Sequence, residues 1–491
     1  MSNVLFTHSY FLSLDPKEYG AMMPYAPLGT LYAAAGARAG GHRVALFDSM
    51  LASGPGEFGL HLRRHRPDVV VIFDDDFNYL TKMCLTRMRE AAFSLTRLAK
   101  AHGSTVIVHG SDPGDHAGEY LGEGADYVIA GEGEATLSEL LGHLAAGRSV
   151  DSVDGLVYVR DGAIVRNRKR ELLHDLDALP LPARDLLDVE RYRALWKRRH
   201  GYFSMNIVTT RGCPFHCNWC AKPVYGQTYH SRTPGSVAGE MALLKTEFRP
   251  DHLWFCDDIF GLKPGWIEEF AAEVIEADAT IPFKCLSRSD LLLKEETILH
   301  LKRAGCQTVW MGAESGSQKI LDAMEKGTSV GQIYESTRRL REAGIRVGHF
   351  LQYGYPGETR SDIESTLRMV KECAPDEIGI SVSYPLPGTK FYERVKSGLG
   401  EKRNWIDSRD LDPMVGTTEY SQEFYRALHR LTHKKFRLWQ GIELLKQSIA
   451  RPSLPDRRTI RRLAASAYHA LTLPGLEAEL EALSRRGDTN R

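Results

Sequence analysis

The stretch TTRGCPFHCNWCAKPVYG, residues 209–226, decides how the chain is interpreted. It places Cys213, Cys217 and Cys220 within eight positions of one another, and no further cysteine follows until Cys256. Cysteines separated by three and two residues can wrap one loop around a cuboidal cluster, because thiolates are the usual ligands of iron–sulfur centres. Three such ligands leave one iron of a four-iron cluster without protein.

A structural zinc site is the alternative for the same loop, and it needs a closed set of four ligands. His216 lies inside the loop and His230 follows it, so a histidine could complete such a set. Structural zinc more often takes its cysteines as two separated pairs, and the spacing here is different. The loop alone therefore favours the cluster.

Bulk composition narrows the class of protein. Lysine plus arginine and aspartate plus glutamate each total 63 in 491 residues, so no net charge draws the chain to nucleic acid or to an anionic membrane. The first residues lack a basic region ahead of an apolar stretch, and no apolar run is long enough to cross a bilayer. We expect a cytoplasmic multidomain enzyme with a small-molecule substrate and no membrane span.

The first part of the chain alternates short β-type runs with helical ones. Five buried strands are expected near Val4 and at residues 43–48, 68–73, 104–110 and 126–131. Strand and helix at this spacing predict an α/β unit built on a doubly wound parallel sheet, which binds ligands beyond the carboxyl ends of its strands.

The rest of the chain predicts three further parts. Residues 155–167 read as a hairpin around Asp161 and Gly162, and the proline-rich residues 176–188 as an extended linker. Six strand and helix units then predict a partial TIM-type (β/α)6 barrel with the cysteine loop at the carboxyl end of its first strand. The expected domains are residues 1–145, 146–195 for the hairpin and linker, 196–400 for the barrel, and 401–491 for a helical C-terminal segment.

The loop RGCPFHCNWC resembles the signature of radical S-adenosylmethionine enzymes. In that family three cysteines hold a [4Fe-4S] cluster, and the fourth iron binds S-adenosylmethionine. Five further stretches resemble the later barrel strands of the same family: FCDDIF, SRSD, GAESGS, GYPGET and YPLPGT. The resemblance implies contacts to S-adenosylmethionine from Trp219, Asp257, Asp258, Arg288, Glu314 and Gln352.

These residues also have ordinary structural interpretations. Asp257 and Asp258 could cap the following helix, and Arg288 could form a surface ion pair. Glu314 lies between buried strand residues and a Gly-Ser turn, so it needs a hydrogen-bonding partner such as a ribose hydroxyl. Trp310 and His349 are expected to point into the barrel. The remaining cysteines are expected in the core: Cys84, Cys256, Cys285, Cys306 and Cys373.

The first domain is similar to that of cobalamin-binding radical S-adenosylmethionine enzymes. Residues 25–49 resemble the opening of that domain and residues 124–141 its end. The resemblance implies cobalamin contacts from Leu28, Gly29, Thr30, Asp74, Asp75, Gly110, Ser111, Glu132, Gly133 and Glu134. The usual Asp-x-His-x-x-Gly loop is missing, since GDHAGE fails the spacing and His109 lacks the aspartate. We therefore expect cobalamin bound without a histidine ligand to cobalt.

The resemblance implies an activity. S-adenosylmethionine would be cleaved reductively to a 5′-deoxyadenosyl radical, and a methyl group carried by cobalamin would pass to an unactivated carbon of a small natural-product or lipid-like substrate. An external electron donor of the flavodoxin or ferredoxin type is implied. One alternative is radical cyclisation or ring contraction without methyl transfer, as in a porphyrin ester cyclase. The other is a zinc-stabilised RNA-binding module that uses the basic residues 429–440.

Overall fold

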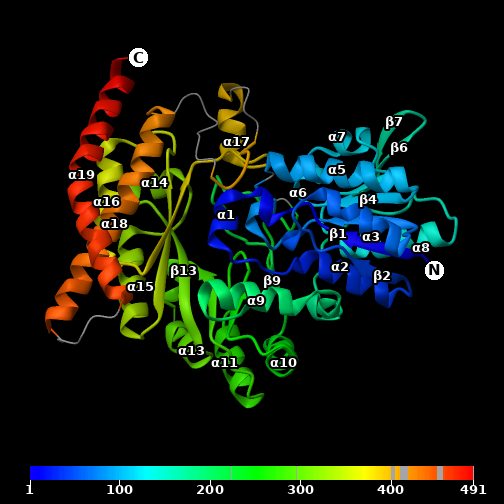
Figure 1. The fold of residues 1–491 in the computed structure, drawn as a ribbon, viewed down its shortest axis with the longest axis horizontal. Helices are drawn as coiled ribbons and strands as arrows, with labels where there is room; N and C mark the ends of the chain where they lie inside the picture. The colour runs from blue at the N-terminus through cyan, green and yellow to red at the C-terminus, as the bar shows by residue number, and fades with distance from the viewer. Residues whose placement is uncertain are drawn as a thin grey trace.

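The computed structural model describes the chain except residues 84, 223, 295, 400–403, 410–418, 451–456 and 490–491. The prediction for Cys84 lies outside the described residues. Two large sheets lie side by side, with the first sheet at one end of the molecule and the C-terminal helices at the other (Figure 1). Among the described residues, no helix is long and apolar enough to cross a membrane.

The first sheet contains all five predicted strands. Its order is β2 (Arg43–Leu46), β1 (Asn3–Thr7), β3 (Val69–Phe73), β4 (Thr105–His109), β5 (Tyr127–Ile129), β6 (Leu156–Arg160) and β7 (Ala163–Arg166). The first five run parallel. The predicted hairpin forms β6 and β7, which continue the same sheet in antiparallel fashion beyond β5.

Helices cover both faces of this sheet, as predicted. Val70 and Ile72 of β3 enter one apolar core, while Val69 and Val71 enter the other. The helices that line these cores are α3 (Phe58–His65) and α5 (Thr86–His102) on the first face, and α2 (Leu28–Ala39) and α8 (Glu134–Ala145) on the second. Because β3 is buried on both sides, its sequence is uniformly apolar.

The second sheet contains the six predicted barrel strands in sequence order, all parallel. They are β8 (Ser204–Ile207), β11 (His252–Phe255), β12 (Phe283–Ser287), β13 (Cys306–Glu314), β14 (Arg346–Tyr353) and β15 (Glu377–Val382). In the described chain β8 and β15 are the two edges, so the sheet is an open half-barrel. The helices that follow its strands are α10 (Pro234–Leu243), α11 (Trp266–Glu276), α13 (Thr297–Arg303), α15 (Val330–Glu342) and α16 (Arg360–Cys373).

The prediction that His349 points into the barrel is wrong. Its Nε2 lies 2.9 Å from Thr337 Oγ1 on α15, so the imidazole faces the helical layer. On the neighbouring strand Met311 also faces α15, with its sulfur 3.6 Å from Ser336 Oγ. Because side chains alternate along a strand, Trp310 lies on the inner face, as predicted. Cys256, Cys285, Cys306 and Cys373 are buried free thiols, which confirms them as core residues.

Two long helices lie beside the half-barrel, at the end of the molecule opposite the first sheet (Figure 1). α18 (Gln422–Ala450) contains the basic residues 429–440 and packs along α19 (Arg457–Thr489). Acidic side chains of α19 take up part of this charge, since Arg430 pairs with Glu479 at 2.6 Å and Lys435 with Glu477 at 2.8 Å. The remaining α-helices are α1 (Pro16–Ala21), α4 (Tyr79–Lys82), α6 (Ser111–Asp115), α7 (Ala117–Gly122), α9 (Val189–His200), α12 (Ser289–Leu292), α14 (Gln318–Ala323) and α17 (Lys390–Val395).

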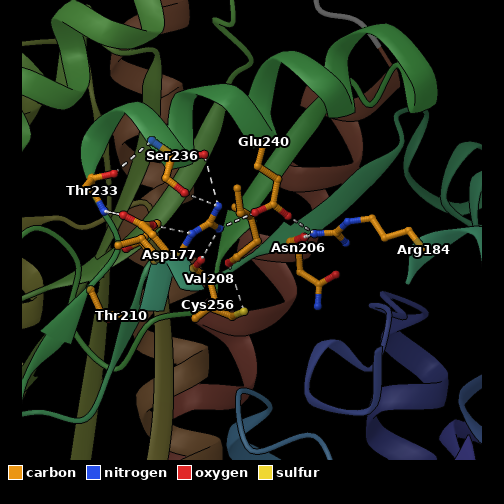
Figure 2. A network of polar contacts seen from close by, with 12 residues as sticks. Asp177, Arg184, Asn206, Val208, Thr210, Thr233, Ser236, Glu240 and Cys256 are labelled. Atoms are coloured by element: carbon orange, nitrogen blue, oxygen red, sulfur yellow. Dashed lines mark hydrogen bonds and ion pairs between the residues drawn. The ribbon is translucent and has the colours of Figure 1, made fainter. Parts of the chain in front are cut away.

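The linker is fixed to the half-barrel by a buried ion pair. Figure 2 shows Arg184, from the linker, reaching Glu240 on α10. Arg184 donates to Glu240 at 2.7 Å and to the Asn206 carbonyl at 3.0 Å, and Arg232 also pairs with Glu240. Burial alone would raise the pKa of Glu240, but the two guanidinium groups lower it below its usual value. The linker is therefore a fixed element and the half-barrel keeps a set position relative to it.

Candidate active site at the junction of the two sheets

The cysteine loop leaves the half-barrel after β9 (Thr210–Arg211), which pairs with β10 (His230–Ser231). Asn218, in the middle of the cysteine loop, fixes the position of the loop. The Asn218 side chain donates to the Ala323 carbonyl at 2.7 Å and accepts from Tyr355 Oη at 2.8 Å, and its backbone N–H donates to the Met324 carbonyl at 3.0 Å. The loop is thus held against α14 and the end of β14.

The three cysteines of the loop are free thiols in a poorly hydrated environment. Burial raises the pKa of Cys220 to about 12 and also raises that of Cys213, and neighbouring cysteines of the loop raise both pKa values further. Lys222 offsets only part of this effect. Thiolates at this place require additional positive charge, and iron bound to sulfur supplies it.

The zinc alternative needs four ligands around one ion. Within the described ranges, no three or more His, Cys, Asp or Glu side chains are grouped so that they could hold one metal ion. His230 instead packs against His174, with ring centroids 4.5 Å apart. Cysteines that bind different irons of one cluster stand farther apart than the ligands of a single ion, so the same finding is compatible with a cluster.

Arg288 lies beside the cysteine loop. Its guanidinium stacks 3.6 Å from the centroid of Phe215, and Nη1 lies 3.8 Å from the sulfur of Cys217. It also pairs with Asp290 at 3.0 Å and donates to the Lys326 carbonyl at 2.9 Å. These neighbours make Arg288 part of the cysteine site, and its contact with S-adenosylmethionine stays a prediction.

Glu314 and Lys326 form a buried ion pair at the carboxyl end of β13. Their charged atoms lie 2.8 Å apart, and both side chains are nearly inaccessible to solvent. Glu314 has a left-handed backbone, with φ of 55°, next to a register shift between Gly312 and Glu314. Strained backbone at a strand end is typical of functional sites. Lys326 was missed from the sequence because it follows a helix, with no motif around it.

Trp219 and Gln352 each have a polar atom without a partner. Trp219 Nε1 and Gln352 Oε1 are both buried and make no hydrogen bond in the described structure. Gln352 Nε2 is occupied, since it donates to Ser383 Oγ at 3.1 Å. Buried polar atoms normally find partners, so these two atoms are suited to a polar ligand.

The two aspartates after β11 already have protein partners. Asp257 accepts hydrogen bonds from the backbone N–H groups of Thr209 and Thr210, at 2.7 and 2.8 Å, and from Thr209 Oγ1 at 2.7 Å. Burial raises the pKa of Asp257 to about 6. Asp258 pairs with Lys82 of α4 at 2.6 Å, which joins the two sheets. Asp257 holds the segment that leads into the cysteine loop.

The predicted cobalamin residues collect at the carboxyl edge of the first sheet. Asp74 accepts from the Ser9 N–H at 2.7 Å and Asp75 from the Gly29 N–H at 2.9 Å, while Thr30 donates to the Phe73 carbonyl at 2.6 Å. Burial raises the pKa of Asp74 to about 6. These bonds hold the start of α2, including the buried Leu28, against the end of β3.

His109 and Asp76 lie at the same edge. His109 Nε2 lies 2.9 Å from the Gly131 carbonyl, and the ring stacks on Phe73 with centroids 3.9 Å apart. A Cβ at Gly133 would come within 2.6 Å of this ring, so only glycine fits there. Burial lowers the pKa of His109 to about 4, so the imidazole is neutral. His109 is thus held inside the domain.

Three polar atoms at this edge are buried without hydrogen-bond partners in the described structure. They are Asp76 Oδ1, His109 Nδ1 and Ser111 Oγ, the last directly after Gly110. Asp76 was not among the predicted residues, and only its place after a buried strand could have indicated it. The sheet edge can therefore accept a polar ligand.

Glu132 and Glu134 bind Arg211, the residue two positions before Cys213. Arg211 Nη2 lies 2.6 Å from Glu134, and Nη1 contacts both Glu132 and Glu134. All three side chains are buried. Burial alone would raise the pKa of Glu134, but Arg211 holds it below its usual value. Residues predicted to contact cobalamin therefore join the first sheet to the cysteine loop.

An apolar cluster surrounds this junction. It contains residues of the first domain, Leu28, Tyr32 and Phe77, together with half-barrel residues Val208, Val224, Tyr225 and Cys256. The Arg211 guanidinium lies 5.2 Å from the ring centroid of Tyr225 and 5.6 Å from that of Phe77. The carboxyl edges of both sheets thus meet at a dry interface beside the cysteine loop.

Comparison with known proteins agrees with this geometry. Residues 207–370 match the family model described as the radical SAM superfamily. An uncharacterized methyltransferase of Pyrococcus horikoshii is 28% identical over 70% of this chain and 74% of its own length. The hopanoid C-3 methylase of Methylococcus capsulatus is 29% identical over 74% of this chain and 68% of the relative. An anaerobic magnesium-protoporphyrin IX monomethyl ester cyclase of Synechocystis is 25% identical over 66% of this chain, which spans 62% of that relative.

Solved structures share the whole architecture. The cobalamin-dependent S-adenosylmethionine radical enzyme OxsB superposes with a TM-score of 0.71 at 16% identity, over 96% of this chain and 72% of that one. The radical S-adenosylmethionine methyltransferase TsrM of Kitasatospora setae gives a TM-score of 0.64 at 19% identity, over 81% of this chain and 75% of that one. Residues 207–370 of this chain therefore match the radical S-adenosylmethionine superfamily, and the chain has the fold of the cobalamin-dependent radical S-adenosylmethionine enzymes.

Proposed function

We propose that the protein is a C-methyltransferase that uses a [4Fe-4S] cluster, S-adenosylmethionine and cobalamin. Its substrate would be a small natural product or lipid-like molecule, and the methyl group would pass to an unactivated carbon of that molecule. The observation that carries the proposal is the buried contact of Arg211 with Glu132 and Glu134. This contact brings the predicted cluster ligands to the sheet edge that contains the predicted cobalamin residues.

The residues present fit these cofactors. Cys213, Cys217 and Cys220 would hold the cluster, and bound iron would lower the raised pKa values of Cys213 and Cys220. The orphaned atoms of Trp219 and Gln352 would contact S-adenosylmethionine, and those at the carboxyl edge of the first sheet would contact cobalamin. Bound together, these groups supply reductive cleavage of S-adenosylmethionine and a transferable methyl group.

The chain's own residues orient the cofactors and exclude water. Arg288 lies beside the cysteine loop, and the Glu314–Lys326 pair fixes the strand end next to it. The apolar cluster around Arg211 keeps solvent from the junction of the two sheets. Exclusion of water protects reactive species from side reactions. Electrons would come from an external donor of the flavodoxin or ferredoxin type.

Isotope tracing tests the proposal without a known substrate. The full-length protein is reconstituted anaerobically with iron, sulfide and cobalamin, reduced, and incubated with S-adenosylmethionine that has a trideuterated methyl group. We expect the label in the cobalamin fraction by mass spectrometry. Formation of 5′-deoxyadenosine with no label in cobalamin, at any reductant concentration, would overturn methyl transfer.

Radical cyclisation is the second candidate function, and the similarity to the magnesium-protoporphyrin cyclase of Synechocystis supports it. A cyclase forms a ring without adding carbon, so the same experiment separates the two. Unlabelled cobalamin together with continued 5′-deoxyadenosine formation is the cyclase outcome. The pairing of Arg430 and Lys435 with carboxylates of α19 gives no support to an RNA-binding role.

A further inference from the structure

Lys284 is a cation on the inner face of the half-barrel, and it forms no ion pair with the residues that the structure describes. Its strand neighbours Phe283 and Cys285 are fully buried toward the helices, so Lys284 points the other way. Its Nζ lies 4.6 Å from the ring centroid of Trp254 and 5.5 Å from that of Tyr25. In the part of the chain that the structure describes, this amine has aromatic rings beside it and no hydrogen-bond or ion-pair partner. Burial lowers the pKa of Lys284, which agrees with an incompletely compensated charge.

Glu377 is the carboxylate whose charge acts on Lys284, and it has an ion-pair partner of its own. Glu377, on the edge strand β15, pairs with Arg346 at 2.7 Å. Four fully buried cations of this protein contrast with the half-buried Lys284, because each has a carboxylate within 3 Å: Arg184, Arg211, Arg232 and Lys326. A buried cation is normally paired, because removing it from water without a counter-charge is costly. Contact with aromatic rings compensates this cost only in part.

Aromatic rings continue from Lys284 along the inner face. Trp310 packs against Phe350 with centroids 4.7 Å apart. A Cβ at Gly348 would overlap the indole of Trp310, and one at Gly379 would touch it at 3.4 Å, so the ring lies flat against two glycines. Phe350 is 39% exposed although it lies in the middle of an interior strand. The inner wall therefore presents partly uncovered ring faces beside an unpaired ammonium.

We propose that this inner wall binds the substrate, with Lys284 receiving a carboxylate and the rings of Trp254, Trp310 and Phe350 receiving a flat apolar body. Sites for small ligands combine such apolar walls with a few polar groups that fix orientation. The substrate class is then an apolar, ring-containing acid. The inference rests on the proposed function only where it identifies the bound acid as the molecule that reacts.

A pair of probes tests the anion directly. 1-Pyrenecarboxylate and neutral 1-pyrenemethanol share the same rings, and binding to the full-length protein is followed by quenching of tryptophan fluorescence. We expect the acid to bind at least tenfold more tightly than the alcohol. Lys284→Met should abolish this preference, Lys284→Arg should keep most of it, and Lys371→Met on the exposed face of α16 should leave it unchanged.

Two results would overturn the inference: equal affinity of wild-type protein for acid and alcohol, or an unchanged preference in Lys284→Met. Circular dichroism and the cluster absorbance of Lys284→Met show that the variant is folded. Because binding is measured without turnover, a failed isotope experiment would remove methyl transfer and leave the anion site in place. If the isotope experiment succeeds and the protein shows no preference for the acid, methyl transfer is supported and the anion site is removed.

Discussion

Arg211 and Lys284 are both removed from most of the solvent, but their surroundings differ. Arg211 has two carboxylates and several aromatic rings around it, and its charge is fully compensated by the protein. Among the described residues, Lys284 has aromatic rings beside it and no carboxylate in an ion pair with it. The difference indicates that a charge neutralised by carboxylates of the protein stabilises the fold. A charge that the protein does not neutralise indicates a site for a ligand of opposite charge.

Removing Arg211 should give the largest effect on stability. Arg211→Met leaves Glu132 and Glu134 buried without a counter-charge, and loss of one partner of a buried pair costs about 3–5 kcal/mol. Urea unfolding of the cofactor-free protein, followed by circular dichroism, measures this loss. The triple variant Arg211→Met, Glu132→Gln, Glu134→Gln should regain most of it. A loss below about 1 kcal/mol for the single variant would contradict a compensated, architectural role.

Glu358 extends the comparison to a buried carboxyl that is not in an ion pair in the described structure. Burial raises its pKa to about 8, so the folded protein keeps this proton while the unfolded chain loses it near pH 4.5. The stabilisation from Glu358 is therefore complete below pH 4.5 and is lost as the pH rises through 8. Glu358→Gln cannot lose a proton, so its stability relative to wild type should rise between pH 5 and pH 9.

Urea midpoints at pH 5, 7 and 9 provide the measurement for Glu358. Glu364→Gln, on the exposed face of helix α16, which begins just after Glu358, is the control and should follow wild type at each pH. Parallel pH profiles for wild type and Glu358→Gln would show that this carboxyl does not keep its proton.

Replacing Lys284 should have the smallest effect on stability, and one of opposite sign. Lys284→Met removes an uncompensated charge from an aromatic environment, so the cofactor-free protein should gain on the order of 1 kcal/mol. The urea midpoint measures it, with Lys371→Met as the matched control. A loss of stability in Lys284→Met would show that the ammonium is already compensated by the protein, as Arg211 is.

Much of the fold could be predicted from the sequence because its strands carry a strong local signal. Val69 to Phe73 is an uninterrupted apolar run, and the hairpin around Asp161 and Gly162 has specific turn residues. The orientation of His349 could not be predicted, because strands buried on both faces show no alternation. Its direction depends on packing against Thr337 of α15.

The charged contacts of the site had no local signal either. Arg211 meets Glu134 across 77 positions, and Lys82 meets Asp258 across 176. Such pairs form only when two domains dock, so spacing within a motif does not reveal them. The cysteines were found because one short loop must supply all three ligands, which makes their spacing a local property.

The spectrum of the reconstituted cluster tests the central claim most directly. After anaerobic reconstitution and reduction, the account predicts about four irons per chain and an electron paramagnetic resonance signal that changes when S-adenosylmethionine is added. Cys213→Ala, Cys217→Ala and Cys220→Ala should each lose the cluster. Two results would contradict a cluster in which one iron binds S-adenosylmethionine. They are zinc in place of iron after anaerobic purification, and a cluster signal that does not change when S-adenosylmethionine is added.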